Sequence, residues 1–248
     1  MLQVNHVNKS YRAGGIMSHK KKQILFDVRF ETRDGECMGI IGESGTGKST
    51  LGRLILGLEK PDSGQILYDG GNVRRRSVRR GVMSAVFQDY SSSMNPYNTV
   101  EKTMAEPLRL AGIPSGDMRD KTVALLEQVG LDGSYLTKFP HEMSGGEAQR
   151  VCIARAISTN PKFILLDEAI SSLDASVAYQ ILVLLKQLKN ELNATFLFIT
   201  HDIHAVRFLC DRTAFFNSGR LLEMVAVKDI DSVKDPYSQR LMSSIFSI

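Results

Sequence analysis

The stretch at residues 42–50 is the feature that most constrains the fold. It reads Gly-Glu-Ser-Gly-Thr-Gly-Lys-Ser-Thr and directly follows an apolar run that ends at Ile41. The spacing G-x-x-x-x-G-K-S is typical of a strand-to-helix loop that holds phosphate, because glycines let backbone N–H groups approach the anion. A helix that opens at Lys48 adds the positive end of its dipole. We therefore expect a bound nucleoside triphosphate.

Each residue type in this loop has a chemical reason. Lys48 can reach the terminal phosphates, and the hydroxyl of Ser49 can hold Mg²⁺. The alternative is a glycine-rich turn without a ligand, but strand, loop and helix signals coincide here. The predicted nucleotide-binding residues of the loop are Gly42, Glu43, Ser44, Gly45, Thr46, Gly47, Lys48, Ser49 and Thr50.

Composition is that of a globular protein with one large domain or two joined subdomains. The chain has 248 residues, and 31 Lys and Arg against 27 Asp and Glu give a net charge of +4. Part of the excess lies in two basic clusters, at residues 19–22 and 74–80, where a solvated face is the commoner explanation. No aromatic residues interleave with the arginines, which argues against a nucleic-acid partner.

The number and spacing of the cysteines and the lengths of the apolar runs indicate the compartment in which the protein works. The 3 cysteines fit neither a zinc site nor a disulfide framework, which favours a reducing cytosol. The start of the chain lacks the pattern of a secretion signal. Every apolar run is shorter than the ~20 residues that a spanning helix needs. We expect any work at a membrane to depend on docking to other subunits.

The order of predicted elements indicates an α/β protein. Strand-like stretches at residues 2–7, 24–31, 36–41 and 64–68 surround one helix at about 48–57. Helical periodicity follows at 100–111, 117–129 and 147–158, and strands return at 162–167 and 194–200 around a helix at 175–192. The pattern predicts a parallel α/β core with a helical insert at about residues 89–160.

Two acids end one of the predicted strands. The apolar run Phe-Ile-Leu-Leu at residues 163–166 is followed by Asp167 and Glu168. A strand buried on both faces delivers such carboxylates to the carboxyl edge of its sheet. Asp167 is placed to bind Mg²⁺, and Glu168 is a candidate for polarising an attacking water. Paired acids after a strand are also common as helix caps, so this motif gains weight from the phosphate loop.

The segment Met-Ser-Gly-Gly-Glu-Ala-Gln-Arg at residues 143–150 carries the next signal. Ser144 and Glu147 fit a Ser-x-x-Glu capping box, so the segment could simply start a helix. That explanation leaves Gly145 and Gly146 unexplained, since a double glycine exposes backbone N–H groups at a helix N-terminus and forms a second anion-binding site.

With these motifs, the sequence resembles the nucleotide-binding subunits of ABC transporters over nearly its whole length. That family's signature is Leu-Ser-Gly-Gly-Gln, and this chain has Met143 and Glu147 at the outer positions. The resemblance implies the ABC ATPase fold: a P-loop NTPase core with a parallel sheet, an N-terminal antiparallel β subdomain and an inserted α-helical subdomain. It implies one nucleotide-binding domain over 1–248, with the core in 1–88 and 161–248 and the signature-bearing helical subdomain in 89–160.

The resemblance also implies roles for single residues. Tyr11 resembles the aromatic residue that stacks on adenine, with an ordinary strand-edge tyrosine as the alternative. Gln88 resembles the glutamine that contacts Mg²⁺ and the attacking water. Asp174 resembles the acid of the loop that crosses to a partner subunit, and it is also a plausible helix cap. Ala169 and Ile170 stand where the family usually has Pro and Thr.

His201 resembles the family's switch histidine, which senses the γ-phosphate. His204 follows three residues later, so a metal site is conceivable. We favour the switch role, because Asp202 between them reads as a helix cap and no third ligand is evident.

The family mechanism explains two phosphate sites in one chain. Two subunits pack head to tail, so that Ser144, Gly145 and Gly146 of one face the ATP that Lys48 and Ser49 of the other hold. The resemblance implies Glu168 as general base, assisted by Gln88 and His201, with Mg²⁺ held by Ser49, Gln88 and Asp167.

The implied partners are a second ATP-binding subunit, two membrane-spanning permease subunits and, indirectly, an extracellular substrate-binding protein. A different, homologous chain is the expected second subunit, with a homodimer as the alternative. The implied location is the cytoplasmic face of the cell membrane, as a peripheral subunit, with no nucleic acid partner.

The transported substrate is harder to predict. The segments at residues 87–96 and 235–239 resemble the importer branch for peptides and nickel. The short ending after the second segment looks more like the nickel or metal-chelate type, so we expect uptake of nickel, cobalt or a related metal complex, with di- or oligopeptides as the alternative. Two other classes are a soluble ABC ATPase acting on nucleic acid or ribosomes and a small-molecule kinase, which has no use for the segment at residues 144–146.

Overall fold

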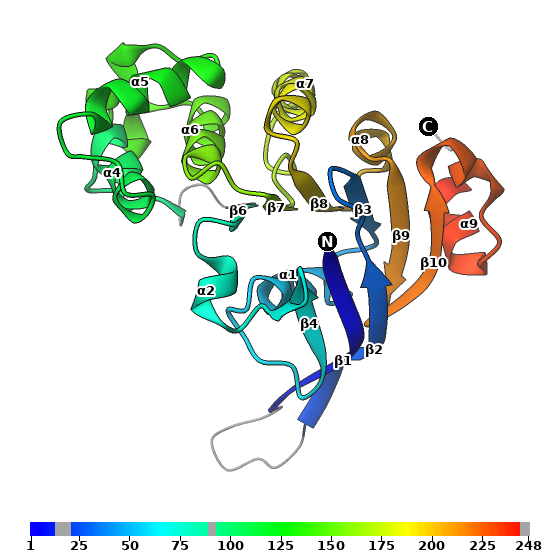
Figure 1. Cartoon of the computed structure of the whole chain (residues 1–248). Coiled ribbons are helices and arrows are strands. Elements are labelled where there is room, and N and C mark those ends of the chain that lie inside the picture. The colour runs from blue at the N-terminus through cyan, green and yellow to red at the C-terminus, as the bar shows by residue number, and fades with distance from the viewer. Residues whose placement is uncertain (13–20, 89–92, 244–248) are drawn as a thin grey trace. The chain divides into compact units, whose positions relative to one another are not determined.

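We describe the protein from a computed structural model that covers residues 1–12, 21–88 and 93–243 (Figure 1). The chain forms two compact units, Met1–Arg79 with Thr195–Ile248, and Arg80–Ala194. The division of roles expected from the sequence, 1–88 and 161–248 against 89–160, stays a prediction. The turn at residues 14–15, residues 19–20 of the first basic cluster and residues 89–92 lie outside the described residues.

The first unit begins with an antiparallel sheet of order β2-β1-β4-β5. Its strands are β1 (Leu2–Arg12), β2 (Lys21–Glu31), β4 (Ser63–Tyr68) and β5 (Gly71–Asn72). In β1 the apolar side chains Leu2 and Val4 alternate with more exposed neighbours, which is the pattern of a sheet with one buried face. Thr32, directly after β2, ties the end of β2 to β1, because its hydroxyl accepts a 3.1 Å hydrogen bond from the backbone N–H of Leu2.

The same unit contains parallel strands that are buried on both faces. Strand β3 (Cys37–Ile41) pairs in parallel with β8 (Thr195–Thr200) and with β9 (Arg212–Asn217), and β9 pairs antiparallel with β10 (Arg220–Ala226). Every residue of β3 and β8 is buried, as their continuous apolar sequences predict. Helices α1 (Lys48–Ile55), α2 (Arg76–Arg79), α8 (Ile203–Leu209) and α9 (Pro236–Ser243) and the 3₁₀ helix η3 (Val227–Ser232) complete the unit.

The second unit combines two parallel strands with helices. Strand β6 (Met83–Phe87) pairs in parallel with β7 (Phe163–Asp167). Between them the chain forms α4 (Val100–Leu110), α5 (Met118–Gln128), η1 (Gly133–Thr137), η2 (Pro140–Glu142) and α6 (Gly145–Ile157), and α7 (Ala175–Leu192) follows β7. Helix α7 buries Ile181, Leu184, Leu185 and Leu188, a spacing of three and four residues that makes one apolar face.

The structure confirms the predicted α/β class, with parallel strands, an N-terminal antiparallel sheet and a helical insert. Strands β5, β6, β9 and β10 were absent from the prediction. Strand β6 is short, and only Val86 within it is buried. In β10 no residue is fully buried, so no buried face requires the alternation of apolar and polar residues by which a strand is predicted.

Gly219 links three parts of the first unit. It lies in the β9–β10 turn with φ +75°, its N–H donates to the carbonyl of Thr46 at 2.9 Å, and its carbonyl accepts from the N–H of Phe26 at 2.8 Å. A Cβ at this position would lie 2.0 Å from the carbonyl oxygen of Ile24. The turn therefore accepts only glycine, and it supports the loop that contains Thr46.

We expect Gly219→Ala to destabilise the protein more than Gly70→Ala does. Both glycines have φ +75°, but nothing lies within 4 Å of a Cβ at Gly70. The control should lose about 1–2 kcal/mol from the left-handed conformation alone. Gly219→Ala should lose a further ~1–3 kcal/mol from the backbone clash. Urea unfolding of the two variants measures the difference, and equal losses would show that the β9–β10 turn adjusts freely.

Candidate functional site

The phosphate-type loop joins β3 to α1 as predicted. Gly47 caps α1 with φ +107°, and Gly45 has φ +77°, so both adopt backbone conformations that favour glycine. Lys48 is the first residue of the helix and is only 5% exposed. Its ammonium donates to the carbonyls of Gly42 at 2.6 Å and Glu43 at 2.8 Å. The Lys48 side chain therefore lies back over the loop, where it contacts the backbone of residues that are expected to bind phosphate.

The loop has the donors that a phosphate group requires. Among the described residues, the backbone N–H groups of Ser44, Gly45, Thr46 and Gly47 donate to no protein acceptor. They precede a helix without an acidic residue in its first turn, so the local field favours an anion. Nothing lies within 4 Å of a Cβ position at Gly45, so the loop is open there. The residues present fit a nucleotide phosphate.

The neighbours in the loop differ in their availability. The N–H of Glu43 donates to the hydroxyl of Tyr237 on α9 at 3.1 Å, so α9 helps to hold the start of the loop. Ser49 is exposed, whereas Thr50 is buried and accepts a 3.2 Å hydrogen bond from Arg53. Thr50 therefore supports the helix, whereas Ser49 lies at the exposed surface of the loop.

His201 lies at the same sheet edge as the loop. In the parallel pair of β3 and β8, Ile41 is in register with Thr200, so Gly42 and His201 leave the sheet side by side. Asp202 caps α8 by accepting from the N–H groups of His204 at 2.8 Å and Ala205 at 3.1 Å, which confirms it as a helix cap. His201 is exposed at the end of β8.

Tyr11 lies near the end of β1 in a charged cluster. Its hydroxyl donates to the carboxylate of Glu59 at 2.5 Å, and Arg53 binds the other oxygen of Glu59 at 2.7 Å. Burial alone would raise the pKa of Glu59, but the hydrogen bonds from Tyr11 and Arg53 outweigh burial and lower it. The ammonium of Lys9 lies 5.2 Å from the ring centroid. These contacts hold the ring in one orientation.

In the second unit, strands β6 and β7 bring three predicted residues to one edge. Phe87 is in register with Asp167, so Gln88 follows β6 where Glu168 follows β7. Asp167 and Glu168 are each 7% exposed, and Gln88 is exposed. Glu168 has φ +53°, a left-handed conformation that a residue with a Cβ seldom adopts. Such strain is frequent at functional sites.

The predicted capping box at the start of α6 is confirmed. The hydroxyl of Ser144 accepts from the N–H of Glu147 at 3.3 Å, and the carboxylate of Glu147 accepts from the N–H of Ser144 at 2.7 Å. The hydroxyl of Tyr135 also donates to Glu147. Hydrogen bonds from Tyr135 and from the Ser144 backbone lower the pKa of Glu147 to about 2.

The double glycine has a packing reason at its second position. A Cβ at Gly146 would lie 2.5 Å from Cγ1 of Val177 on α7, so α6 packs closely against α7 at this turn. Gly145 is the first residue of α6. Asp174 is the N-cap of α7, as its alternative interpretation predicted, but its side chain makes no capping hydrogen bond and only its carbonyl accepts, from Ala178 at 2.8 Å.

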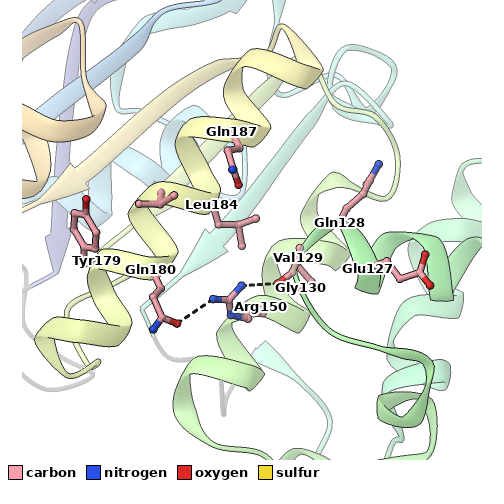
Figure 2. Close-up of a pocket in the computed structure, with 10 residues that line it drawn as sticks. Glu127, Gln128, Val129, Gly130, Arg150, Tyr179, Gln180, Leu184 and Gln187 are labelled. Atoms are coloured by element: carbon pink, nitrogen blue, oxygen red, sulfur yellow. Dashed lines mark hydrogen bonds between the residues drawn. The ribbon is translucent and has the colours of Figure 1, made fainter.

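Arg150 holds the other side of α6 in place. Its guanidinium donates to the carbonyl of Val129 at the end of α5, at 2.6 Å, and to the side-chain oxygen of Gln180 on α7, at 3.3 Å (Figure 2). Around it lies a hollow of about 480 Å³ that includes Tyr179 and Leu184 of α7. A cation at a helix C-terminus is favourable, so Arg150 stabilises the junction of three helices.

The predicted residues therefore gather in two groups. The first unit carries Tyr11, the loop of residues 42–50 and His201, and the second carries Gln88, the acids after β7, the signature glycines and Asp174. Sequence reasoning missed three supporting residues: Tyr135, Tyr237 and Gln149, whose amide donates to the carbonyl of Ala169 at 2.7 Å. No short motif connects Tyr135 to Glu147 or Tyr237 to the loop, since the partners lie 12 and 194 positions apart.

We expect Tyr135→Phe to raise the pKa of Glu147 from about 2 toward its ordinary 4.5, because the strongest hydrogen bond to the carboxylate is lost. A carboxyl whose pKa is lower in the folded than in the unfolded state stabilises the fold at pH values above its ordinary pKa. This stabilisation is lost as the pH falls toward the folded-state pKa. Below about pH 4.5, the free energy of unfolding should therefore fall less steeply with decreasing pH in the variant than in the wild type.

Carbon-detected NMR titration of the Glu147 carboxyl measures this shift. Tyr97→Phe is the matched control, because Tyr97 is 84% exposed and the hydrogen bonds of the Glu147 carboxylate among the described residues come from Tyr135 and Ser144. An identical Glu147 titration curve in Tyr135→Phe and in the control would show that the Tyr135 hydrogen bond is not the cause.

Comparison with known proteins supports a single family. The model of the family described as ABC transporter matches residues 25–171. The metal-staphylopine import system ATP-binding protein CntF of Staphylococcus aureus is 43% identical over all of both chains. The oligopeptide transport ATP-binding protein AppF of Bacillus subtilis is 40% identical over 88% of this chain and 69% of the relative. The nickel import ATP-binding protein NikE of Rhodospirillum rubrum is 38% identical over 99% of this chain and 91% of the relative.

A solved structure agrees with these relatives. The ATP-binding cassette MJ0796, in a dimeric post-hydrolysis state bound to ADP and phosphate, matches with a TM-score of 0.81 and 28% identity over 92% of this chain and 99% of the other. The family match covers the phosphate loop, the signature and the acids after β7 together. The chain therefore belongs to the ABC transporter family, as one of its ATP-hydrolysing subunits.

Proposed function

We propose that this subunit powers the import of a metal complex, such as a nickel, cobalt or related metal chelate. The observation that carries the proposal is the match over the full length of both chains to a metal-staphylopine import ATPase. A nickel import ATPase also matches over nearly all of both chains. Peptide import is the second candidate, because an oligopeptide relative is 40% identical over most of this chain.

We propose a division of labour among the site residues. The open N–H groups of residues 44–47 and the ammonium of Lys48 bind the phosphates of ATP, and Ser49, Gln88 and Asp167 would hold Mg²⁺. The oxygen ligands of this set suit Mg²⁺, which neutralises phosphate charge during transfer. The exposed position of Ser49 and the buried position of Asp167 at the end of β7 support the assignment.

Glu168 is the proposed general base for the attacking water. Gln88 follows β6 where Glu168 follows β7, which supports a role in which Gln88 orients one water and Glu168 deprotonates it. His201, beside the start of the phosphate loop, senses the terminal phosphate. Tyr11 stacks on adenine with a ring whose hydroxyl is already fixed by Glu59.

The remaining proposed residues act toward a second ATP-binding subunit. Ser144, Gly145 and Gly146 offer a helix N-terminus to the ATP of the facing subunit, and Asp174 lies in the segment that crosses to it. The dimeric state of the MJ0796 cassette supports this pairing. The facing subunit is proposed to be a different, homologous chain.

Permease subunits complete the proposed assembly on the cytoplasmic face of the membrane. In the described part of the chain, no helix has the length and apolar character needed to cross a bilayer. We propose that two membrane-spanning permeases and an extracellular substrate-binding protein contact the substrate, so its pocket lies outside this chain.

We expect Glu168→Gln to reduce ATP turnover by about 10²–10⁴-fold, because an amide cannot accept the proton of the attacking water. ATP binding should persist, since the phosphate loop is unchanged. Phosphate release and nucleotide retention by the purified transporter measure the two effects. Glu106→Gln, at an exposed position on α4, is the control. Turnover near that of the control would exclude Glu168 as the base.

The substrate assignment is tested by uptake in a strain that lacks this gene. Accumulation of radiolabelled nickel or cobalt, supplied with a chelator, should fall to background and return on complementation. Uptake of a labelled di- or oligopeptide should be unchanged. Lost peptide uptake with normal metal accumulation would reverse the two candidates.

A further inference from the structure

The buried side chain of Gln149 joins α6, which begins with the signature glycines, to the segment that follows β7. The amide nitrogen of Gln149 on α6 donates to the carbonyl of Ala169 at 2.7 Å. Gln149 is 1% exposed and Ala169 is 3% exposed, so no water competes for this bond. Both residues belong to the unit Arg80–Ala194.

The bond acts on the backbone directly beside Glu168. The carbonyl of Glu168 accepts from the N–H of Ser171 at 3.1 Å and from its hydroxyl at 2.9 Å. The carbonyl of Ile170 accepts from the N–H of Leu173 at 3.2 Å. Between these local bonds, the carbonyl of Ala169 depends on Gln149 from another element. The left-handed φ of +53° at Glu168 persists only if its surroundings hold it.

The other end of the link is the signature itself. Gln149 lies five residues after Ser144, which corresponds to about 7.5 Å along a helix. That first part of α6 is rigid, because the capping box closes it and Gly146 packs against Val177. A shift of Ser144 along the helix axis therefore moves the Gln149 amide relative to Ala169.

We propose that Gln149 is a positioning residue that couples the signature segment to Glu168 within one chain. The proposal rests on the proposed function, in which residues 144–146 face the ATP of the partner subunit while Glu168 serves the ATP of its own. The bond fixes the backbone after Glu168 and so holds Glu168 in the strained conformation that aims its carboxylate. Displacement of α6 weakens this hold, so occupancy of one ATP site alters hydrolysis at the other.

The chemistry of glutamine suits this role. Its neutral amide can be buried without the cost of a buried charge, and it donates a hydrogen bond that a carboxylate cannot. A glutamate at this position would donate only while protonated, and burial favours the protonated form. Leucine has a similar size and donates nothing. Comparing glutamine, glutamate and leucine at position 149 therefore separates the effect of the hydrogen bond from the effect of packing.

The experiment compares Gln149→Leu and Gln149→Glu in the transporter copurified with its own subunits. Gln149→Leu should lower kcat by about 10–100-fold at every pH with KM for ATP within about twofold of wild type, because a small misplacement of the base affects the chemical step. Gln149→Glu should approach wild-type kcat at pH 6 and fall toward the leucine variant by pH 9, since the ionised carboxylate cannot donate to Ala169.

The controls separate this proposal from folding and from the role of Glu168. Gln128→Leu and Gln128→Glu carry the same changes at an exposed position of α5, and melting temperatures report on folding. Two Gln149 variants with wild-type kcat, or with equal losses at every pH, would overturn the positioning role. If Gln149→Leu fails to fold, the pH dependence of Gln149→Glu decides alone. Normal turnover in Glu168→Gln would instead overturn the proposed base.

Discussion

Parallel strands buried on both faces are the constraint on which the rest of the structure depends. Such strands end together, so their carboxyl ends present successive loops at one edge. In the first unit, β3 and β8 deliver the phosphate loop and His201 side by side. In the second unit, the buried strand β7 pairs in parallel with the more exposed β6, so Gln88 and Glu168 also leave one edge side by side. Functional residues from distant parts of the sequence come together because β3, β7 and β8 bury both faces by pairing in parallel with neighbouring strands.

The site segments are held by residues that do not touch the reaction. Gly219 supports the phosphate loop from the β9–β10 turn, and Tyr237 binds the N–H of Glu43 from α9. The signature is held by Glu147, whose carboxylate receives bonds from both Ser144 and Tyr135. Each functional segment is fixed by several hydrogen bonds at once. Its geometry is therefore set before a ligand binds, although each bond alone is weak.

The signature helix combines two roles in a few residues. Its capping box is an ordinary way to start a helix, and in the proposed function the same turn offers backbone N–H groups to an anion. Close packing of Gly146 on Val177 and the buried bond from Gln149 to Ala169 tie this turn to α7 and to the segment after β7. The capping-box interpretation of the motif is therefore confirmed, and its anion-binding role belongs to the proposed function.

Local chemistry by itself determined the phosphate loop, the two acids after a buried strand, the capping box and the α/β class. Each follows from a spacing over a few residues, where backbone needs and side-chain types suffice. Tertiary structure alone decided that Tyr135 supports Glu147, that Gly219 supports the loop, that Gln149 reaches Ala169, and that β10 is a strand. These depend on contacts between residues far apart in the chain, and such contacts exist only once the strands and helices have packed.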